Sequence, residues 1–295
     1  MGAIDTAFVR QFGSTVEFLA QQKGTRLRRA IGNQERLKAE FAFFDQIGPT
    51  SAVRTATRNA DSPLIKTDHQ RRRVGMVNVE WGDLIDDFDR VRMLIDPTSP
   101  TAQNAGFAVG REMDLIIIES FFGDAATGKE GNTTVSFPAG QQVAVNFGAA
   151  ANTGLTIAKL REARRRLLAA NVDPQADGPF YIGVNATALD DLLGTTEVTS
   201  ADFNTVRALV NGEINSFLGF NFIHTELLLT DANAYRRLPV WAANGMGLAM
   251  GIEPTARIAE RADKRFSTYV YWSMVMGAVR LEEVKVVEIK IDETV

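Results

Sequence analysis

The clearest pattern in the chain is a long run of apolar residues at helical spacing. The run follows Ser99 and Pro100, which suit the N-cap and the first turn of a helix, and it stops before Gly123. Within it, apolar or small side chains recur every three or four residues. Their positions are Ala102, Ala105, Val109, Met113, Ile116 and Ser120. The spacing predicts a helix over residues 100–122, about 35 Å long at ~1.5 Å per residue.

The last turns of this predicted helix are apolar on nearly every side. The residues responsible are Ile116, Ile117, Ile118, Phe121 and Phe122. A helix that is apolar all round is normally buried, because no face of it suits water. We therefore expect this end to be buried in its own subunit or against a partner.

The second half of the chain mixes helical and strand-like patterns. Thr156 suits the N-cap of a helix to Ala170, and a buried strand is expected at 179–185. A hairpin is expected around 135–145, and short helices at 186–193 and 202–210. The C-terminal part predicts short strands separated by Gly, Pro and Asn, at residues 217–226, 236–251, 255–261, 267–282 and 284–291. The pattern predicts an α+β fold.

The N-terminal part is polar and lacks the pattern of a self-sufficient core. Up to about Phe44 it favours a helical or irregular arm with a few apolar anchors. From Gly48 to residue 92, charges are mixed with short alternating segments, and the basic run Arg71–Arg73 favours a solvated strand edge. We expect this polar excursion to lie across a neighbouring molecule, and the removal of residues 61–79 to cost little core.

Composition narrows the class of protein. The chain has 295 residues, a net charge of −4 and no Cys. The acidic balance excludes a global basic field for nucleic acid, and the lack of Cys excludes disulfides, thiolate zinc sites and a cysteine nucleophile. The N-terminus lacks a signal-peptide pattern, and the apolar run 266–279 is shorter than the ~20 residues of a membrane helix. We expect a soluble chain without a membrane partner.

The sharpest short motif is Gly-Asp-Ala-Ala-Thr-Gly-Lys at residues 123–129, which matches most of a phosphate-binding P-loop. Glu130 follows Lys129 where a P-loop needs Ser or Thr. The motif also follows the end of a predicted helix, whereas a P-loop opens one. We interpret it as a helix-terminating loop.

Other polar residues favour structural roles. His69 and His224 lack an accompanying metal-ligand or triad motif. The basic set Arg161 and Arg164–Arg166 lies opposite apolar residues of its helix, which is typical of a solvated face.

An acidic cluster also lacks the pattern of a metal site. Its spacing has no central glycine of a calcium loop, and neighbouring arginines favour a helix start with ion pairs. Its members are Asp83, Asp86, Asp87 and Asp89, next to Arg90 and Arg92. We expect no metal, no cofactor and no catalytic residue.

Long stretches of the chain resemble the major capsid proteins of tailed bacteriophages with the Hong Kong 97-type fold. One of them is DRVRMLIDPTSPTAQNAGFAVGREMDLIIIESFFG at residues 89–123. The others are 154–174, 192–226 and 285–291. Within this family the chain looks like a subgroup of short-tailed and related phages, and the resemblance covers most of the chain from about residue 60. It implies a shell-building structural protein and not an enzyme.

The resemblance also implies a division of the chain. The expected parts are an N-terminal arm (1–47), an extended loop (48–92), a peripheral domain with a spine helix (93–153), an axial domain (154–250) and return strands to the peripheral domain (251–295). The extended loop would reach over an adjacent subunit. We expect intersubunit contacts in and near it, at Lys66, Arg71, Arg72, Arg73, Trp81, Asp86, Asp89 and Arg90.

The partners implied are further copies of the chain in hexamers and pentamers, a scaffolding protein, a portal and, where a phage has them, decoration proteins. Double-stranded DNA would fill the shell without sequence-specific binding. The location implied is the virion, with a procapsid that assembles in the cytoplasm of the bacterial host and expands as DNA enters. The Lys–Asn cross-link of the family's original member has no residue-by-residue match here.

Two alternatives remain at this point. An encapsulin-type nanocompartment shell shares the fold and would enclose a cargo enzyme in place of DNA. A nucleotide-binding enzyme would use the loop from Gly123 to Lys129.

Overall fold

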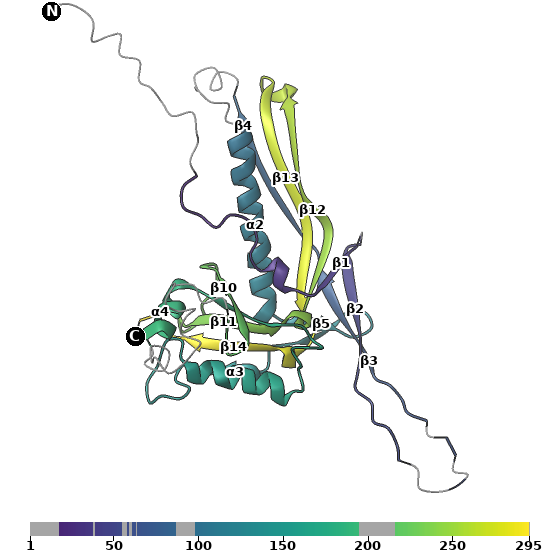
Figure 1. Cartoon of the computed structure of the whole chain (residues 1–295). Helices are drawn as coiled ribbons and strands as arrows, with labels where there is room; N and C mark the ends of the chain where they lie inside the picture. Colours follow the sequence, from purple (N-terminus) through teal and green to yellow (C-terminus); the bar gives the residue numbers. More distant parts are fainter. Residues whose placement is uncertain are drawn as a thin grey trace, which may run out of the picture. The chain divides into compact units, whose positions relative to one another are not determined.

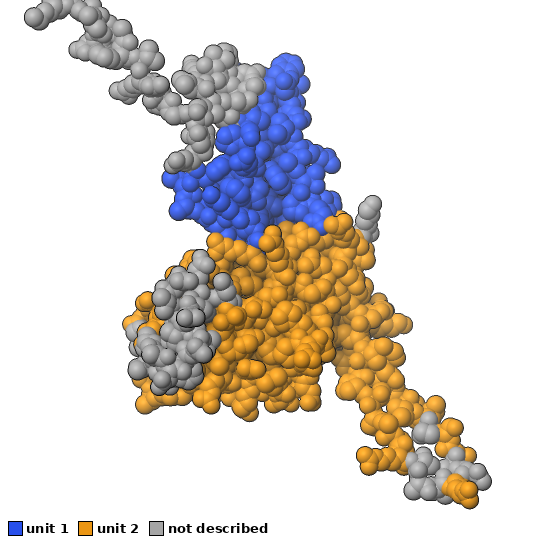
Figure 2. All heavy atoms as spheres, viewed as in Figure 1, with its two compact units in different colours: residues 1–25, 78–112, 252–274 blue, residues 26–77, 113–251, 275–295 orange. Residues whose placement is uncertain are grey.

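The computed structural model describes residues 18–37, 39–54, 58, 61–62, 64–86, 98–194 and 216–294 (Figure 1). The chain forms two compact units, each built from three separate stretches (Figure 2). Unit 1 comprises Met1–Thr25, Asn78–Glu112 and Ile252–Met274, and unit 2 comprises Arg26–Val77, Met113–Gly251 and Val275–Val295. Because the two units alternate along the sequence, neither is formed by one contiguous segment.

The described strands form three sheets, with the orders β1-β12-β13-β4, β7-β14-β11-β8-β10-β9 and β2-β3-β5-β6. The strands are β1 (Asn33–Arg36), β2 (Phe41–Ile47), β3 (His69–Gly75), β4 (Val77–Ile85), β5 (Ala125–Thr127), β6 (Thr133–Val135), β7 (Gln142–Val143), β8 (Phe180–Val184), β9 (Ser216–Phe217), β10 (Phe220–His224), β11 (Arg236–Ala242), β12 (Met246–Arg261), β13 (Ser267–Arg280) and β14 (Val286–Ile291).

Helices accompany these sheets, so the predicted α+β class is confirmed. The α-helices of the described residues are α2 (Thr98–Phe122), α3 (Ile157–Ala169) and α4 (Ala186–Gly194). The short 3₁₀ helices are η2 (Arg28–Ala30), η3 (Ala139–Gln141), η5 (Ala243–Gly245), η6 (Ala262–Lys264) and η7 (Glu283–Lys285).

The long helix expected from the apolar spacing is α2. It begins at Thr98, so Ser99 lies within the first turn and the prediction of Ser99 as the N-cap is wrong. Its end is confirmed, since the Gly123 N–H donates to the Glu119 carbonyl at 3.0 Å and the helical run stops there. Ile117 and Phe121 in its last turns are buried, as the all-round apolar pattern predicted.

Unit 1 packs large aromatic side chains against glycines. A Cβ on Gly106 of α2 would lie 3.3 Å from the indole of Trp272, closer than ordinary van der Waals contact, so the indole would have to shift. Gly82 of β4 similarly lies under the ring of Tyr269. On another side of α2, the rings of Phe18 and Phe107 meet edge to face, with centroids 5.5 Å apart. Close approach at these glycines thus contributes to the packing of unit 1.

In unit 2, Trp241 of β11 joins a helix end, the six-stranded sheet and the N-terminal part. Its ring centroid lies 4.7 Å from that of Phe121 and 5.7 Å from that of Tyr181 on β8. Its indole N–H donates to the Ala30 carbonyl at 3.0 Å, which satisfies a fully buried donor. Sequence-distant segments are therefore held by one side chain.

Part of the predicted N-terminal arm belongs to this core. The buried carboxylate of Asp114 on α2 accepts the backbone N–H groups of Arg26 and Leu27 at 2.8 and 3.2 Å. β1 then pairs in parallel with β12, from Asn33 opposite Gly247. Residues 26–36 are thus integrated in unit 2.

Two expectations about strands are wrong. No hairpin forms at 135–145, because β6 pairs with β5 while β7 pairs in parallel with β14. The segments 236–251 and 255–261 do not give only short strands either, since β12 continues from Met246 through Arg261. The expected strand at 179–185 and helix at 186–193 are confirmed as β8 and α4, and the expected helix at 202–210 lies outside the described residues.

The basic helix α3 begins as predicted, with the Thr156 hydroxyl oxygen accepting the Lys159 N–H at 3.4 Å. Its arginines are only in part a solvated face. Arg165 and Arg166 donate to Glu162 at 2.7 and 2.8 Å, and these hydrogen bonds lower the pKa of the Glu162 carboxyl to about 2. The guanidinium of Arg164 donates to the Leu218 carbonyl at 3.0 Å. Much of the positive charge on this helix is therefore engaged within the chain.

Candidate functional site

Strands β2 and β3 form an antiparallel hairpin that lies at the base of the polar excursion (Figure 1). Phe41 pairs with Gly75 and Ile47 with His69, and the Gly48 N–H extends the ladder to the Asp68 carbonyl at 2.8 Å. Successive strand residues face opposite sides, so the hairpin has an inner and an outer face. The inner face is buried and consists of Ala42, Phe44, Arg72 and Val74.

The outer face of the hairpin carries aromatic and cationic side chains in register. The guanidinium of Arg73 lies 4.7 Å from the Phe41 ring centroid, and that of Arg71 lies 5.2 Å from the Phe43 centroid. Arg71 also donates to both Asp45 oxygens, at 2.5 and 3.2 Å, and this hydrogen bonding holds the pKa of the Asp45 carboxyl below its usual value. Both phenylalanines remain partly exposed, which is typical of a surface that binds protein.

Beyond the hairpin, the excursion leaves apolar side chains in water. Every described residue from 49 to 70 is exposed. Leu64 is 90% exposed, and Ile47, Val53 and Ile65 are exposed as well. When a partner covers exposed apolar side chains, their removal from water lowers the free energy of the complex. This part of the chain therefore has the character of a docking element.

The base of the hairpin is fixed to the turn that follows β13. The Leu281 carbonyl oxygen accepts a bond from each strand, from Gln46 Nε2 at 2.9 Å and from Arg72 Nε at 2.9 Å. The Arg72 guanidinium also binds both oxygens of Glu283, at 2.6 and 2.8 Å. We call this set, Gln46, Arg72, Leu281 and Glu283, the hairpin anchor.

Gly277 of β13 supports the anchor by allowing close approach. A Cβ at this position would overlap the Gly75 carbonyl oxygen and the Val74 side chain. We expect Gly277→Ala to lower the free energy of unfolding by about 1–3 kcal/mol, because the backbone of β3 would have to shift. Chemical denaturation measures this difference.

Gly75 provides the matched control for that substitution. It lies at the other side of the same contact, and a Cβ there meets nothing within 4 Å. Gly75→Ala should therefore change the unfolding free energy by less than ~0.5 kcal/mol. Equal effects at the two glycines would contradict the close-approach explanation.

The structure separates the residues that we expected at intersubunit contacts. Lys66 is exposed in the excursion, and Arg71 and Arg73 lie on the outer face of β3. Arg72 points the other way: it is 4% exposed and paired with Glu283 of its own chain, so within the subunit its guanidinium is already engaged. β3 also lies between β2 and β5, which corrects the expectation of a solvated edge.

The remaining expected contact residues follow the hairpin. Trp81 and Asp86 are half-buried, on β4 and directly after it, while Asp89 and Arg90 lie outside the described residues. β4 takes part in the sheet with β13, although the excursion was expected to run to residue 92. Contacts of all these residues with another copy stay a prediction.

Sequence reasoning missed β2, Gln46 and Glu283. Residues 41–47 were assigned mainly to the polar arm, although Ala42 and Phe44 alternate with Phe41 and Phe43 in the manner of a strand. That alternation was the available signal. Glu283 had none, because its role depends on Arg72, 211 positions away.

The P-loop-like segment follows the end of α2, forms the strand β5 and enters the turn between β5 and β6. Gly128 and Gly131 adopt positive φ angles of 92° and 67°, and the Gly131 N–H donates to the Gly128 carbonyl at 3.0 Å. Lys129 is exposed at the rim of an open groove of about 810 Å³. The segment leads into the strand β6, so it lacks the helix N-terminus that a P-loop offers to phosphate.

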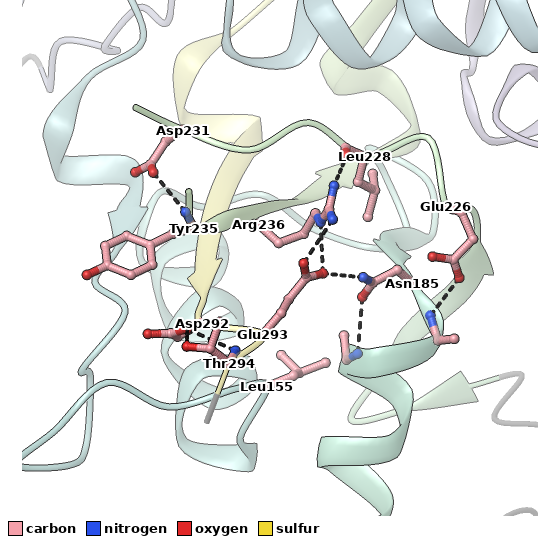
Figure 3. Close-up of polar contacts among 12 residues, drawn as sticks. Leu155, Asn185, Glu226, Leu228, Asp231, Tyr235, Arg236, Asp292, Glu293 and Thr294 are labelled. Atoms are coloured by element: carbon pink, nitrogen blue, oxygen red, sulfur yellow. Dashed lines mark hydrogen bonds and ion pairs between the residues drawn. The ribbon is translucent and has the colours of Figure 1, made fainter. Parts of the chain in front are cut away.

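A second polar centre joins the C-terminal residues to the six-stranded sheet and α4 (Figure 3). Arg236 of β11 donates to both Glu293 oxygens at 2.8 Å, and these bonds lower the pKa of the Glu293 carboxyl. Asn185 donates to Glu293 and accepts the Ala188 N–H at 3.1 Å, so it also caps α4. Glu226 accepts the Ala186 N–H at 2.8 Å at the same helix end. These contacts join Glu293 to the six-stranded sheet and to the start of α4, which is a structural role.

A buried lysine strengthens the same region. The Lys159 ammonium donates to the carbonyls of Thr153 and Gly154 at 2.8 Å and of Lys290 at 3.1 Å. Burial lowers the pKa of this ammonium to about 8, while the nearby Asp191 and Asp292 oppose the shift. Its three carbonyl partners satisfy the donors, so the group serves to join α3, the preceding turn and β14.

Neither histidine lies in a metal-ligating arrangement. His69 is exposed at the start of β3, and His224 contacts Arg26 at 3.0 Å and Glu226 at 2.8 Å. Among the described residues, no group of three His, Asp or Glu side chains could hold a metal ion. Within the same residues, no helix has the length and apolar character needed to cross a membrane.

Comparison with known proteins decides the family. The sequence model described as phage capsid protein matches residues 4–293. The chain belongs to the phage capsid protein family. A search of curated protein sequences finds no match.

Solved capsid structures share the fold of this phage capsid protein. The capsid of cyanophage P-SCSP1u has a TM-score of 0.75 and 16% identity, over 99% of this chain and 95% of that one. The capsid of Ralstonia phage GP4 gives 0.74 and 10%, over 96% and 95%. A structure of Mycobacterium phage Che8 gives 0.65 and 16%, over 97% and 98%. The expected Hong Kong 97-type fold is thereby confirmed.

Proposed function

We propose that this phage capsid protein is the major head protein of a tailed phage. It self-assembles as hexamers and pentamers into an icosahedral shell that encloses double-stranded DNA. The observation that carries the proposal is the family match over residues 4–293. A role in the shell and no catalytic role follows from this proposal.

The hairpin and its excursion support this function physically. A segment whose described residues from 49 to 70 are all exposed, with Leu64 and Ile65 among them, requires another molecule to bury its apolar side chains. In a closed symmetric shell every copy can offer the same surface to a neighbour, so the same docking element can be used by every copy. The proposed partner of this element is therefore a second copy of the chain.

The finer organisation belongs to the same proposal. We assign residues 1–47 to an arm, 48–92 to the extended loop, 93–153 to the peripheral domain, 154–250 to the axial domain and 251–295 to the return strands. Strand β14 of that last part pairs with β11 and β7 in the six-stranded sheet. A scaffolding protein, a portal and decoration proteins are proposed as further partners, with assembly in the bacterial host cytoplasm.

DNA contact is proposed to be nonspecific. The chain has a net charge of −4, so it offers no overall positive charge with which to bind the phosphate backbone of DNA. The proposed role of the shell toward DNA is enclosure.

Electron microscopy of the purified, expressed chain tests the proposal most directly. We expect closed shells or ring-shaped capsomers, alone or with a scaffolding protein, and fast-sedimenting species in analytical ultracentrifugation. Only monomers under all assembly conditions would contradict it. Particles that enclose a cargo enzyme and no DNA in their host would favour a nanocompartment instead.

A further inference from the structure

A buried arginine closes the C-terminal end of α2. Arg280, the last residue of β13, is fully buried and donates from Nη1 to the carbonyls of Phe121 and Gly123, at 2.8 and 2.9 Å. Its Nη2 donates to the Val135 carbonyl of β6 at 3.3 Å. A cation at this position satisfies carbonyls that a helix end leaves without partners and matches the negative end of the helix dipole. Arg280 therefore caps the C-terminal end of α2.

The carboxylate of Glu283 in the hairpin anchor contacts both Arg280 and Arg72. Glu283 binds Arg72 through both oxygens, and its Oε1 lies 3.8 Å from Arg280 Nε. Arg72 belongs to β3 of the hairpin, whereas Arg280 holds the end of α2. Glu283 is thus shared between the hairpin and the helix end, and the whole cluster lies within unit 2.

The charge balance of the cluster makes Glu283 hard to replace. Arg72 and Arg280 are both buried and share the Glu283 carboxylate, while Asp124 also acts electrostatically on Arg280. Within the part of the chain that the structure describes, Arg72 Nη1 and Arg280 Nε have no hydrogen-bond partner. Burial lowers the pKa of the Arg280 guanidinium, and the positive charge of Arg72 acts in the same direction. Loss of the Glu283 carboxylate would remove the counter-charge that the two buried cations share.

We propose that Glu283 is a positioning residue that ties the base of the β2–β3 hairpin to the C-terminal end of α2. Through this shared carboxylate, the direction in which the extended loop leaves the subunit is set by the end of the long helix. The consequence for shell geometry rests on the proposed function. The coupling itself is a property of the folded subunit.

Hydrogen exchange of the unassembled full-length chain tests the coupling. We expect Glu283→Gln to accelerate exchange by about tenfold in two separate segments, the hairpin (41–47 and 69–75) and the last turn of α2 (118–122). At the hairpin the factor corresponds to the loss of the charge-assisted hydrogen bonds to Arg72. At the helix end it corresponds to the loss of the ion pair with Arg280, whose Nε lies 3.8 Å from the carboxylate. Arg72→Met should accelerate only the hairpin, because Arg280 keeps its carboxylate and its carbonyls.

Glu293→Gln is the matched control. Glu283 and Glu293 have similar side-chain exposure, 22% and 23%, and each binds one arginine through both oxygens. Only Glu283 lies at the hairpin. The control should accelerate exchange near Asn185 and Arg236 and leave the hairpin and the end of α2 unchanged.

The outcomes separate the possibilities. Acceleration of both segments by Glu283→Gln alone supports the coupling. Acceleration of the hairpin without the helix end, or an equal effect of Glu293→Gln on the hairpin, overturns it. If Glu283→Gln does not fold, Glu283→Asp decides, because the shorter side chain keeps the charge but cannot reach both arginines. Acceleration of both segments by Glu283→Asp supports the proposal, and acceleration of the hairpin alone overturns it.

Particle imaging then tests the consequence for assembly. If the exchange measurements support the coupling, Glu283→Gln shells should be fewer and more variable in diameter than wild-type or Glu293→Gln shells. Uniform Glu283→Gln shells in normal yield would overturn the role in loop direction. If the wild-type chain forms no shells at all, the proposed function fails, while the exchange data still judge the coupling.

Discussion

Replacement of residues 49–67 by an Asn-Gly turn should abolish closed shells and leave the subunit folded. The hydrogen bond between Gly48 and Asp68 marks the last rung of the ladder, so a tight turn can close the hairpin there. Every described residue that would be removed is exposed, and none contributes to the core. Electron microscopy measures assembly, and circular dichroism with thermal melting measures folding.

The ends of this deletion matter because a wider one damages the subunit. The sequence alone suggested that residues 61–79 could be removed at little cost, and that expectation is wrong. The segment contains Val74, which packs with Ala42, Phe44 and Leu281 in a buried apolar cluster, and it contains Arg72 of the anchor. Removal of 61–79 therefore serves as the contrasting variant, with loss of folding as well as assembly. Intact, equally stable shells from the 49–67 replacement would show that the excursion does not hold neighbours together.

Truncation of Ile117 to Ala should destabilise the subunit by about 2–5 kcal/mol. Ile117 is 0% exposed in the last turns of α2, where surrounding side chains are close-packed and cannot fully collapse into the cavity. Domains commonly have only about 5–15 kcal/mol of stability, so a loss of this size should also reduce particle yield. Chemical denaturation of the subunit and counts of assembled particles measure the two effects.

Lys129→Ala is the control that also separates the structural from the nucleotide-binding interpretation. Lys129 is exposed in the β5–β6 turn, and such changes usually stay within ~0.5 kcal/mol. We expect normal particles and normal melting from this variant. Lost function with unchanged folding at Lys129, together with normal melting for Ile117→Ala, would overturn both the packing of α2 and the rejection of a phosphate-binding loop.

Local patterns in the sequence were enough to predict the helices. The apolar spacing from Ala102 to Ser120 is a property of one segment, and it identified α2 to within two residues at its start. The same holds for α3, whose N-cap Thr156 bonds the N–H of Lys159 within the first turn. Contacts of this kind lie within a few residues, so a single sequence records them.

Strand lengths and partners could not be predicted in this way. β12 contains Gly251 and Pro254, which suggested breaks, yet the strand runs on because Gly251 lies against Val275 of the adjacent β13. Similarly, β7 finds its partner in β14 at Glu288, far along the chain. These pairings depend on sequence-distant partners, and no local signal specifies them.

In the candidate site, three consecutive residues combine a feature that local sequence predicts with one that depends on a distant partner. Arg71, Arg72 and Arg73 look alike as a basic run, but strand alternation places the middle one inward. Period two alone would have suggested the alternation. The inward arginine, Arg72, is tolerated because it pairs with Glu283. The sequence of the three arginines cannot indicate this partner.

The double acceptor at Leu281 has a practical consequence for engineering this particle. The group that holds both hairpin strands is a backbone carbonyl, so a side-chain substitution at Leu281 would alter the core but would not remove the acceptor. The donors, Gln46 and Arg72, lie on β2 and β3 themselves and outside the interval from Gly48 to Asp68. A foreign peptide inserted in that interval would therefore leave both hydrogen bonds of the hairpin to Leu281 in place.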